Sequence, residues 1–166
     1  MTGALNLLRK SAVELLKECG LYAVTAMDAA PRKRWGGPVV AVSISRVVCA
    51  PGGFRDYLGL RTDPDSGVES ELYGRGVELT VALDIYAPRE GGERACQETM
   101  AVLAEAVACR GLGGLTALEV NGGRVEFLEK DGLYRLPVTC LCKGWLVARV
   151  DNGGAFVDIE VRGRTI

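Results

Sequence analysis

Histidine is absent from this chain of 166 residues. Histidine is the side chain most often used as a general base near neutral pH, and it is a standard metal ligand. Serine–histidine–aspartate triads, cysteine–histidine pairs and histidine-bound metals are therefore excluded. No other catalytic motif replaces them, so we expect a protein that is not an enzyme.

Long hydrophobic runs are missing too. The longest, 100–104, has five residues, whereas a membrane-spanning helix needs about 20. The N-terminus lacks the uncharged hydrophobic segment of a signal peptide, since Glu14, Lys17 and Glu18 interrupt it. We therefore expect no membrane span, a cytosolic location and reduced thiols for the six cysteines.

Signatures of phosphate and nucleic-acid binding are also missing. None of the 22 glycines forms G-x-G-x-x-G or G-x-x-x-x-G-K-[ST]. The formal net charge is −1, whereas a dedicated nucleic-acid-binding domain is strongly basic. Seven basic and three acidic residues lie in 1–50, against three basic and six acidic residues in 77–110. We expect no cofactor and no sequence-specific binding of nucleic acid. The uneven distribution of charge along the chain would help to orient neighbouring copies.

Two short motifs resemble metal sites but have a simpler interpretation. Cys140 and Cys142 would point to the same face of a strand, and no second cysteine pair accompanies them. They are interpreted as core residues. The sequence DPDSG (63–67) resembles the start of a calcium loop, but glycines occupy its fifth and twelfth positions, Gly67 and Gly74. It is interpreted as a polar turn, and no metal site is predicted.

Periodicity predicts two amphipathic helices. An apolar stripe at helical spacing covers 5–19, with Thr2 as the expected cap and Gly20 as the expected end. A second helix is predicted over 93–110. Its apolar stripe consists of Cys96, Met100, Leu103 and Val107.

Alternation predicts the strands. In 39–48 one face is expected to carry Val40, Val42, Ile44 and Val48. Residues 73–88 alternate most clearly, and one face carries Val77, Leu79, Val81, Leu83 and Ile85. A short strand is predicted over 21–27. The last third is expected to form antiparallel strands over 115–120, 124–129, 133–149 and 155–161, with tight turns at Asn121-Gly122, Asp131-Gly132 and Asn152-Gly153.

Together these elements predict one α+β domain over 1–166, in which two helices pack on a mainly antiparallel sheet. Residues 50–76 form either a long inter-strand loop or an extended hairpin with DPDSG at its tip. Loops of this length are usually functional or disordered, and this one is rich in the tyrosine and arginine that interfaces favour. Its expected contacts with another subunit are Phe54, Arg55, Tyr57, Leu58, Arg61, Leu72, Tyr73 and Arg75.

A second loop combines three cations with a tryptophan in PRKRWGG (31–37). Such a group can contact phosphate or stack on a base. Three charges are too few to be specific, so a solvated loop or a subunit contact is favoured. The residues of this second contact loop are Arg32, Lys33, Arg34 and Trp35.

The order of these elements resembles a known family. An amphipathic helix, an alternating strand, a loop reading DYLG…DPDSG…ELYGR, the strand VELTVALDIYAP, the helix GGERACQETMAVLAEAV and closing strands cover roughly 1–162. This arrangement is similar to the tail terminator, or tail-completion, proteins of tailed bacteriophages and prophages.

The resemblance implies an α+β subunit of a hexameric ring on the end of the tail tube. Such a ring stops tube polymerisation and provides the surface that joins the head connector, and its neighbouring subunits exchange loops and strand edges. The implied partners are further copies of the chain and the tail tube protein, with sheath and head connector proteins beyond them. Assembly would take place in the host cytoplasm and the product would be the virion tail.

Three alternatives stay open at this point. The first is another ring component, either a tube subunit or a head–tail connector. The second is a small cytosolic module with a ligand cleft under the long loop. The third is an enzyme that works with cysteine or carboxylate chemistry in the absence of histidine.

Overall fold

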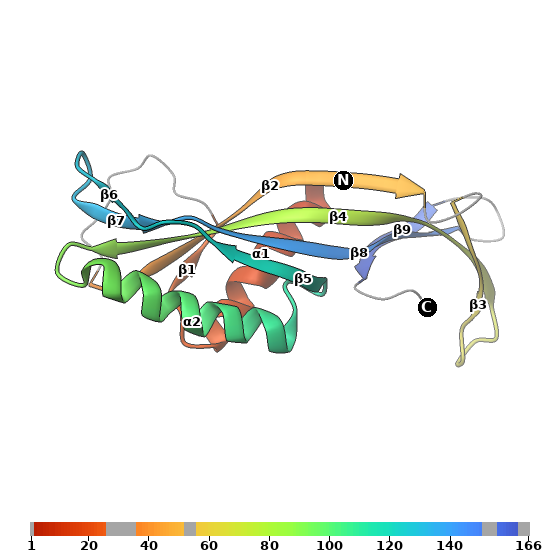
Figure 1. Ribbon diagram of the computed structural model, residues 1–166. Coiled ribbons are helices and arrows are strands. Elements are labelled where there is room, and N and C mark those ends of the chain that lie inside the picture. Colours follow the sequence, from red (N-terminus) through yellow and green to blue (C-terminus); the bar gives the residue numbers. More distant parts are fainter. Residues whose placement is uncertain (1, 26–35, 52–55, 151–155, 163–166) are drawn as a thin grey trace.

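The computed structural model describes residues 2–25, 36–51, 56–150 and 156–162, with side chains for 5–25, 36–51 and 56–147. Two helices and a mainly antiparallel sheet of nine strands make up these residues, which confirms the expected α+β class (Figure 1). In chain order they are α1 (Thr2–Glu18), β1 (Ala23–Val24), β2 (Val39–Pro51), β3 (Tyr57–Thr62), β4 (Glu69–Pro88), α2 (Gly92–Arg110), β5 (Thr116–Gly122), β6 (Glu126–Leu128), β7 (Leu133–Leu136), β8 (Val138–Val150) and β9 (Phe156–Arg162).

The 20-residue strand β4 is the centre of the sheet. Along one edge it pairs with β2 and then with β3, and along the other with β7 and β8. β8 in turn pairs with β5 and β9, while β6 pairs with β7. β1 pairs with β2 and is the parallel neighbour in this set. Since β4 spans both ends of the sheet, its alternation sets the faces of the whole molecule.

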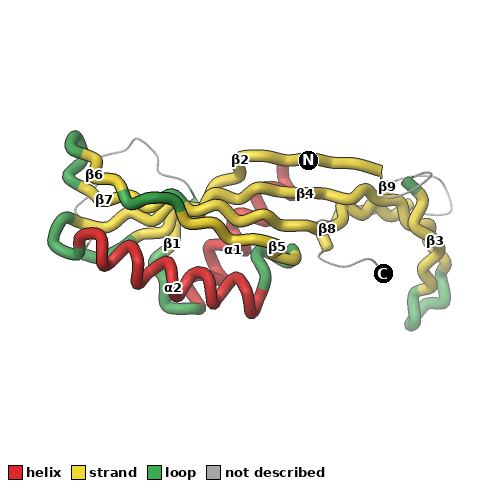
Figure 2. The backbone as a smooth tube through the Cα atoms, in the orientation of Figure 1, coloured by secondary structure: helices red, strands yellow, loops and turns green. Residues whose placement is uncertain are grey.

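One face of β4 forms the core with the two helices. Leu79, Val81, Leu83 and Ile85 alternate along this face and are at most 1% exposed. They cluster with Leu8, Ala12 and Leu16 of α1 and with Cys96, Leu103 and Val107 of α2. Figure 2 shows α2 running along one side of the sheet. The predicted helical stripes and the predicted face of β4 are therefore confirmed.

The end of α1 follows from Gly20. Its N–H donates to the carbonyl of Lys17 at 3.0 Å, and the N–H of Leu21 donates to the carbonyl of Leu16 at 2.9 Å. This pair of bonds is the Schellman arrangement, which needs a residue with positive φ, and Gly20 has φ 82°. At the other end the helix begins at Thr2, whose side chain is outside the described part, so its role as a cap stays a prediction.

A bulge in β2 changes the faces predicted for this strand. Ile44 lies opposite Val81, but Arg46 lies opposite Thr80, so Ser45 is the extra residue. One extra residue turns every following side chain to the other face. Val48 therefore leaves the face of Val40, Val42 and Ile44, contrary to the prediction.

The predicted turns of the last third have different outcomes. Asp131-Gly132 joins β6 to β7, and Gly132 has φ 65° as expected. Asn121-Gly122 is not a turn, because both residues lie within β5 and pair with Thr139 and Val138 of β8. The strand predicted over 133–149 is divided at Pro137 into β7 and β8. The turn at Asn152-Gly153 lies outside the described residues.

Among the described residues no helix covers the other face of the sheet, and we call it the open face. In cross-strand order its residues include Ser43, Ala82 and Thr139, and further along Val48, Glu78 and Lys143; Arg46, opposite Thr80, lies on the same face. Of the short strand predicted over 21–27, the structure has β1, and residues 26–27 lie outside the described part. No helix in the described ranges is long and apolar enough to cross a membrane.

Candidate subunit interface

A hairpin extends the sheet beyond the part that packs against the helices. It consists of residues 56–76, which comprise β3, the turn and the first part of β4, and we call it the arm. Figure 1 shows it at the end of the sheet farthest from α2, with β9 nearby. Of the two alternatives, the described residues 56–76 form the extended hairpin.

The tip of the arm is the polar turn predicted for DPDSG. The carboxylate Oδ1 of Asp63 accepts hydrogen bonds from the N–H groups of Asp65 at 2.9 Å and Ser66 at 3.0 Å. Gly67, with φ 67°, returns the chain toward β4 by donating to the carbonyl of Asp63 at 2.9 Å. The bonds from Ser66 and Asp65 hold the pKa of Asp63 below its ordinary value. The side chain of Asp63 thus shapes the turn.

The base of the arm is held by a close approach at Gly74. Tyr57 lies opposite Tyr73 and Gly59 opposite Leu72, so Leu58 is a bulge residue. A Cβ added to Gly74 would lie 2.5 Å from Cδ1 of Leu58 and 3.0 Å from the carbonyl oxygen of Leu146. Only glycine leaves room for this packing. The N–H of Gly74 also donates to the carbonyl of Asp56 at 2.6 Å.

The inner side of the arm has a small apolar row of its own. Leu72 and Val147 are each 2% exposed, and Leu58 is half-buried against Gly74. These residues lie on the open-face side of β4, opposite to the side that packs on the helices. The arm is therefore ordered by contacts separate from the main core.

The outer side of the arm is exposed, and the cross-strand register assigns its residues. Tyr57 lies opposite Tyr73, Leu60 opposite Glu71, and Thr62 opposite Glu69. Residues directly opposite in an antiparallel pair share a face, so these side chains form one surface. Leu60 is 60% exposed and Tyr57 is 46% exposed. We call Tyr57, Leu60, Glu69, Glu71 and Tyr73 the arm face.

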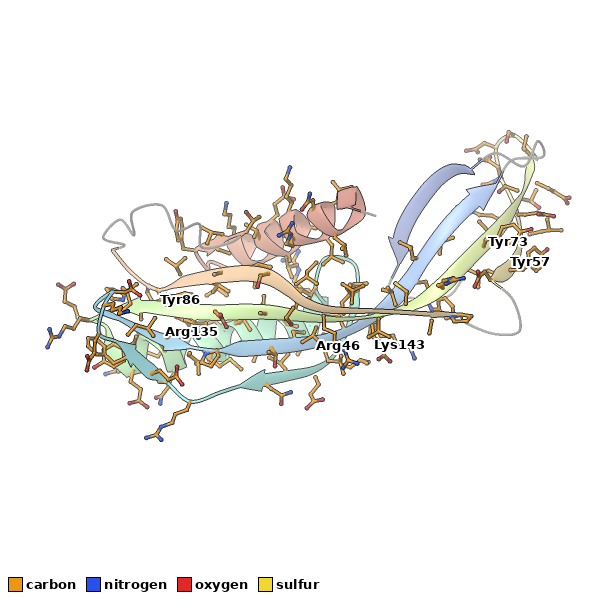
Figure 3. All side chains as sticks on the ribbon, turned by 90° about the horizontal axis from the view of Figure 1, so that it is seen from above. Arg46, Tyr57, Tyr73, Tyr86, Arg135 and Lys143 are labelled. Carbon is orange, nitrogen blue, oxygen red and sulfur yellow. The ribbon has the colours of Figure 1, made fainter. Side chains whose placement is uncertain are left out.

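The two tyrosines of the arm face are held in place by neighbours. Their rings meet edge to face, with centroids 5.5 Å apart and planes at 64°. The hydroxyl of Tyr73 donates to Oε2 of Glu71 at 2.7 Å, and this bond raises the pKa of Tyr73. Figure 3 shows both tyrosines at the outer end of the molecule. The arm face thus presents fixed aromatic rings beside carboxylates.

Arg75 fastens the base of the arm. Its Nη2 and Nε lie 2.8 Å and 3.1 Å from Oδ2 of Asp56, and this contact raises the pKa of Arg75. Both side chains are more than one-third exposed. Arg61, farther out, is half-buried, and its Nη1 has no hydrogen-bond partner in the described part of the chain.

The predicted interface residues fall into different settings. Tyr57 and Tyr73 lie together on the arm face, as a contact surface requires. Leu58 and Leu72 pack inside the arm, and Arg75 is engaged with Asp56 in the same chain. Leu60, which belongs to the arm face, was not among the predicted contacts. Outside the described residues lie Phe54, Arg55, Arg32, Lys33, Arg34 and Trp35.

A groove at the root of the arm was not predicted. It lies on the open face, where β4 and β8 bend toward the arm, and has a volume of about 420 Å³. We call it the root groove; it is lined by Val48, Ala50, Pro51, Gly76, Val77, Glu78, Lys143 and Trp145. Figure 3 labels Arg46 of β2 and Lys143 of β8 in this region; they lie opposite Thr80 and Glu78 of β4, on the same face. Its lining comes from strands β2, β4 and β8, which are far apart in sequence. No single segment therefore predicts the groove, and its signals in the sequence are limited to a small residue, Gly76, and a large aromatic residue, Trp145.

The CLC motif belongs to the core. Cys140 and Cys142 are both 0% exposed, on one face of β8, with their sulfur atoms 3.4 Å apart. The hydrogen bond with Cys140 and burial both raise the pKa of the Cys142 thiol. Across the described ranges, no three residues among cysteine, aspartate and glutamate are grouped to hold a metal ion.

Comparison with known proteins gives little further guidance. No family model and no curated protein matches the chain. Among solved structures, a chain of the virion of a native gene transfer agent particle is similar with a TM-score of 0.33 and 13% identity. The match covers 86% of this chain and 92% of that chain. A TM-score this low supports no inference, so the functional argument rests on the residues of this chain.

Proposed function

We propose that this chain is a non-enzymatic structural subunit of a phage-type tail. Copies of it would form a ring, in the host cytoplasm, that caps the tail tube, ends its polymerisation and offers the surface for joining the head. The class of particle comes from the order of elements and the segments quoted above. The observation that carries the proposal is the arm face, with its exposed aromatic and aliphatic side chains beside two carboxylates.

The arm face has the composition of an interface. Tyrosine is enriched where proteins bind each other, and an apolar patch rimmed by charge is typical of a binding surface. The main core contains no residue of the arm, so the body does not need the arm for its own packing. A 20-residue strand that carries a hairpin beyond this core is best explained by a partner.

Assembly state is the direct test. We expect the purified chain to form a discrete oligomer, either alone or when mixed with tail tube protein, and native mass spectrometry would give its stoichiometry. Open filaments formed by the chain alone would favour the alternative of a tube subunit. A monomer under both conditions would overturn the proposal.

A hairpin deletion tests the role of the arm. Pro51 lies opposite Arg75, so joining these two residues by Asn-Gly replaces 52–74 with a two-residue turn that suits antiparallel strands. We expect this variant to keep its far-ultraviolet circular dichroism spectrum and to lose association. If association survives in the folded variant, the arm is not the interface. The matched control is Leu118→Ala, which alters an apolar residue 53% exposed on β5, away from the arm.

A further inference from the structure

The root groove has the features of a receiving site for a protein surface. Its volume of about 420 Å³ is far larger than the roughly 30 Å³ that a water molecule occupies. Trp145, Val48 and Ala50 supply apolar walls, and Gly76 leaves the floor without a side chain. A Cβ at Gly76 would lie 3.7 Å from the carbonyl oxygen of Ala50, an ordinary contact, so a methyl group fits here without strain.

The charges around the root groove are complementary to those of the arm face. On the open face at and beside the groove, Arg46 lies opposite Thr80 and Lys143 lies opposite Glu78, and the three charged side chains Arg46, Glu78 and Lys143 give a net charge of +1. The arm face carries Glu69 and Glu71, while Arg75, the next residue on the same side of β4, is paired with Asp56. The nearby tip adds two aspartates, at 63 and 65, so attraction between the two surfaces is favourable.

The two surfaces lie on opposite sides of one continuous strand. Glu69, Glu71 and Tyr73 have odd numbers in β4, whereas Gly76 and Glu78 have even numbers. The pairing of β4 with β8 runs without a shift from Glu71 to Ala82, so the alternation is unbroken between them. The same strand is also paired along its other edge. The arm of one molecule therefore cannot fold back onto its own groove.

We infer that the arm face of one copy docks in the root groove of a second copy. Leu60 and the two tyrosines lie against Trp145 and the neighbouring apolar wall, while Glu69 and Glu71 face Arg46 and Lys143. Because the two surfaces differ, the contact is head-to-tail, and repeated head-to-tail contacts give a ring when the rotation closes. The inference rests on the proposed function, since it names the partner surface of the same interface.

The test uses two variants that each destroy one surface. The arm variant combines Leu60→Lys with Glu71→Lys, and the groove variant combines Gly76→Leu with Lys143→Ala. The controls alter residues of like exposure elsewhere, Leu118→Lys on β5 and Lys130→Ala between β6 and β7. Circular dichroism and thermal melting select the folded variants, and sedimentation gives the assembly state.

Each folded variant alone is expected to associate more than tenfold more weakly than wild type, whereas both controls assemble normally. An equimolar mixture of the two variants is expected to give a discrete heterodimer. In that dimer the intact arm of the groove variant meets the intact groove of the arm variant, and growth stops because the two remaining surfaces are altered.

Three results would overturn the inference. Normal assembly of either variant would show that its altered surface is not part of the contact, and this result would not contradict the ring proposal. Failure of both variants without a heterodimer in the mixture shows that the two surfaces matter separately and do not meet. A wild-type chain that stays monomeric with and without tube protein overturns both this contact and the proposed function.

Discussion

The body and the arm of this molecule are stabilised in different ways. In the body, both helices and strands β2, β4 and β8 bury one large apolar cluster, in which residues such as Leu83 and Ile85 have no exposed surface. In the arm, order comes from strand pairing, the turn at the tip, one exposed ion pair and a short row around Leu72. The difference separates folding from recognition: the body determines whether the chain folds, and the arm presents a surface.

Such a division has a thermodynamic consequence. Local opening free energies in a protein range from near zero to the full free energy of unfolding, and regions with few buried apolar contacts open most easily. The arm has few such contacts. Substitutions in the arm should therefore change its local protection or its contacts and leave global unfolding nearly unchanged.

The largest expected effect comes from comparing one leucine of the body with one leucine of the arm. Leu83→Ala removes a side chain that is 0% exposed in the body, and we expect the free energy of unfolding to fall by about 2–5 kcal/mol. Leu60→Ala, at a residue 60% exposed in the arm, should change it by less than about 0.5 kcal/mol. Urea denaturation of the two variants measures both. Equal losses would mean that the arm belongs to the main cooperative unit.

The body could be predicted from sequence because its signals are local. Both helical stripes and the alternating face of β4 follow from the periods 3.6 and 2, which a single segment displays by itself. The buried pair Cys140 and Cys142 follows in the same way. Residues at i and i+2 of a strand point to the same face whichever strand pairs with it, so this burial can be predicted from one segment.

The arm and the root groove depend on pairing between segments that are distant in sequence, and local patterns do not predict the register of that pairing. The bulge at Ser45 reversed the face of Val48, and nothing in 39–48 marks it. Asn121-Gly122 has the composition of a turn, but the pairing of β5 with β8 keeps it extended. The root groove needs the register of β2, β4 and β8 together. Local sequence therefore pointed to the tyrosines of the arm but not to the root groove, in which we infer that they dock.

The next effect probes the close packing at the base of the arm. In Gly74→Ala the new methyl group would lie 3.0 Å from the backbone carbonyl of Leu146 as well as against Leu58. We expect the amides of β3 to lose about 1–3 kcal/mol of protection against hydrogen exchange, a cost typical of overpacking. The amides of α2 should be unaffected.

Gly76→Ala is the matched control for this prediction. Its Cβ would lie 3.7 Å from the nearest atom, which is ordinary contact. Both residues belong to β4 and neither has positive φ, so the two variants share the intrinsic difference between glycine and alanine in a strand. The same loss of protection in both variants would exclude the contact with Leu58 and Leu146 as its cause.

A smaller effect is expected from the ion pair between Asp56 and Arg75. Because both side chains are more than one-third exposed, Asp56→Asn should cost the arm less than about 1 kcal/mol of local protection. The loss should shrink in 1 M salt, where the screening length falls to about 3 Å. Glu98→Gln removes a more exposed pair with Arg94 on α2 and should leave β3 protection unchanged. A loss of the same size at both salt concentrations would show that it does not come from the charge–charge attraction between Asp56 and Arg75.

The smallest effect concerns the tip, where the carboxylate of Asp63 accepts two backbone hydrogen bonds. These bonds lower the pKa of Asp63 from its ordinary value of 3.8, so its charged form stabilises the folded turn. A carboxyl group with a lowered folded pKa contributes this stability above its unfolded pKa and loses it as the pH falls through the folded pKa. We expect the amide signals of Asp65 and Ser66 to titrate in nuclear magnetic resonance spectra with a midpoint below 3.8. In Asp63→Asn the side-chain oxygen can still accept, so the turn should persist and this titration should vanish. A midpoint at or above 3.8, or a Ser66 amide titration with the same midpoint after the substitution, would show that the carboxylate does not hold the tip.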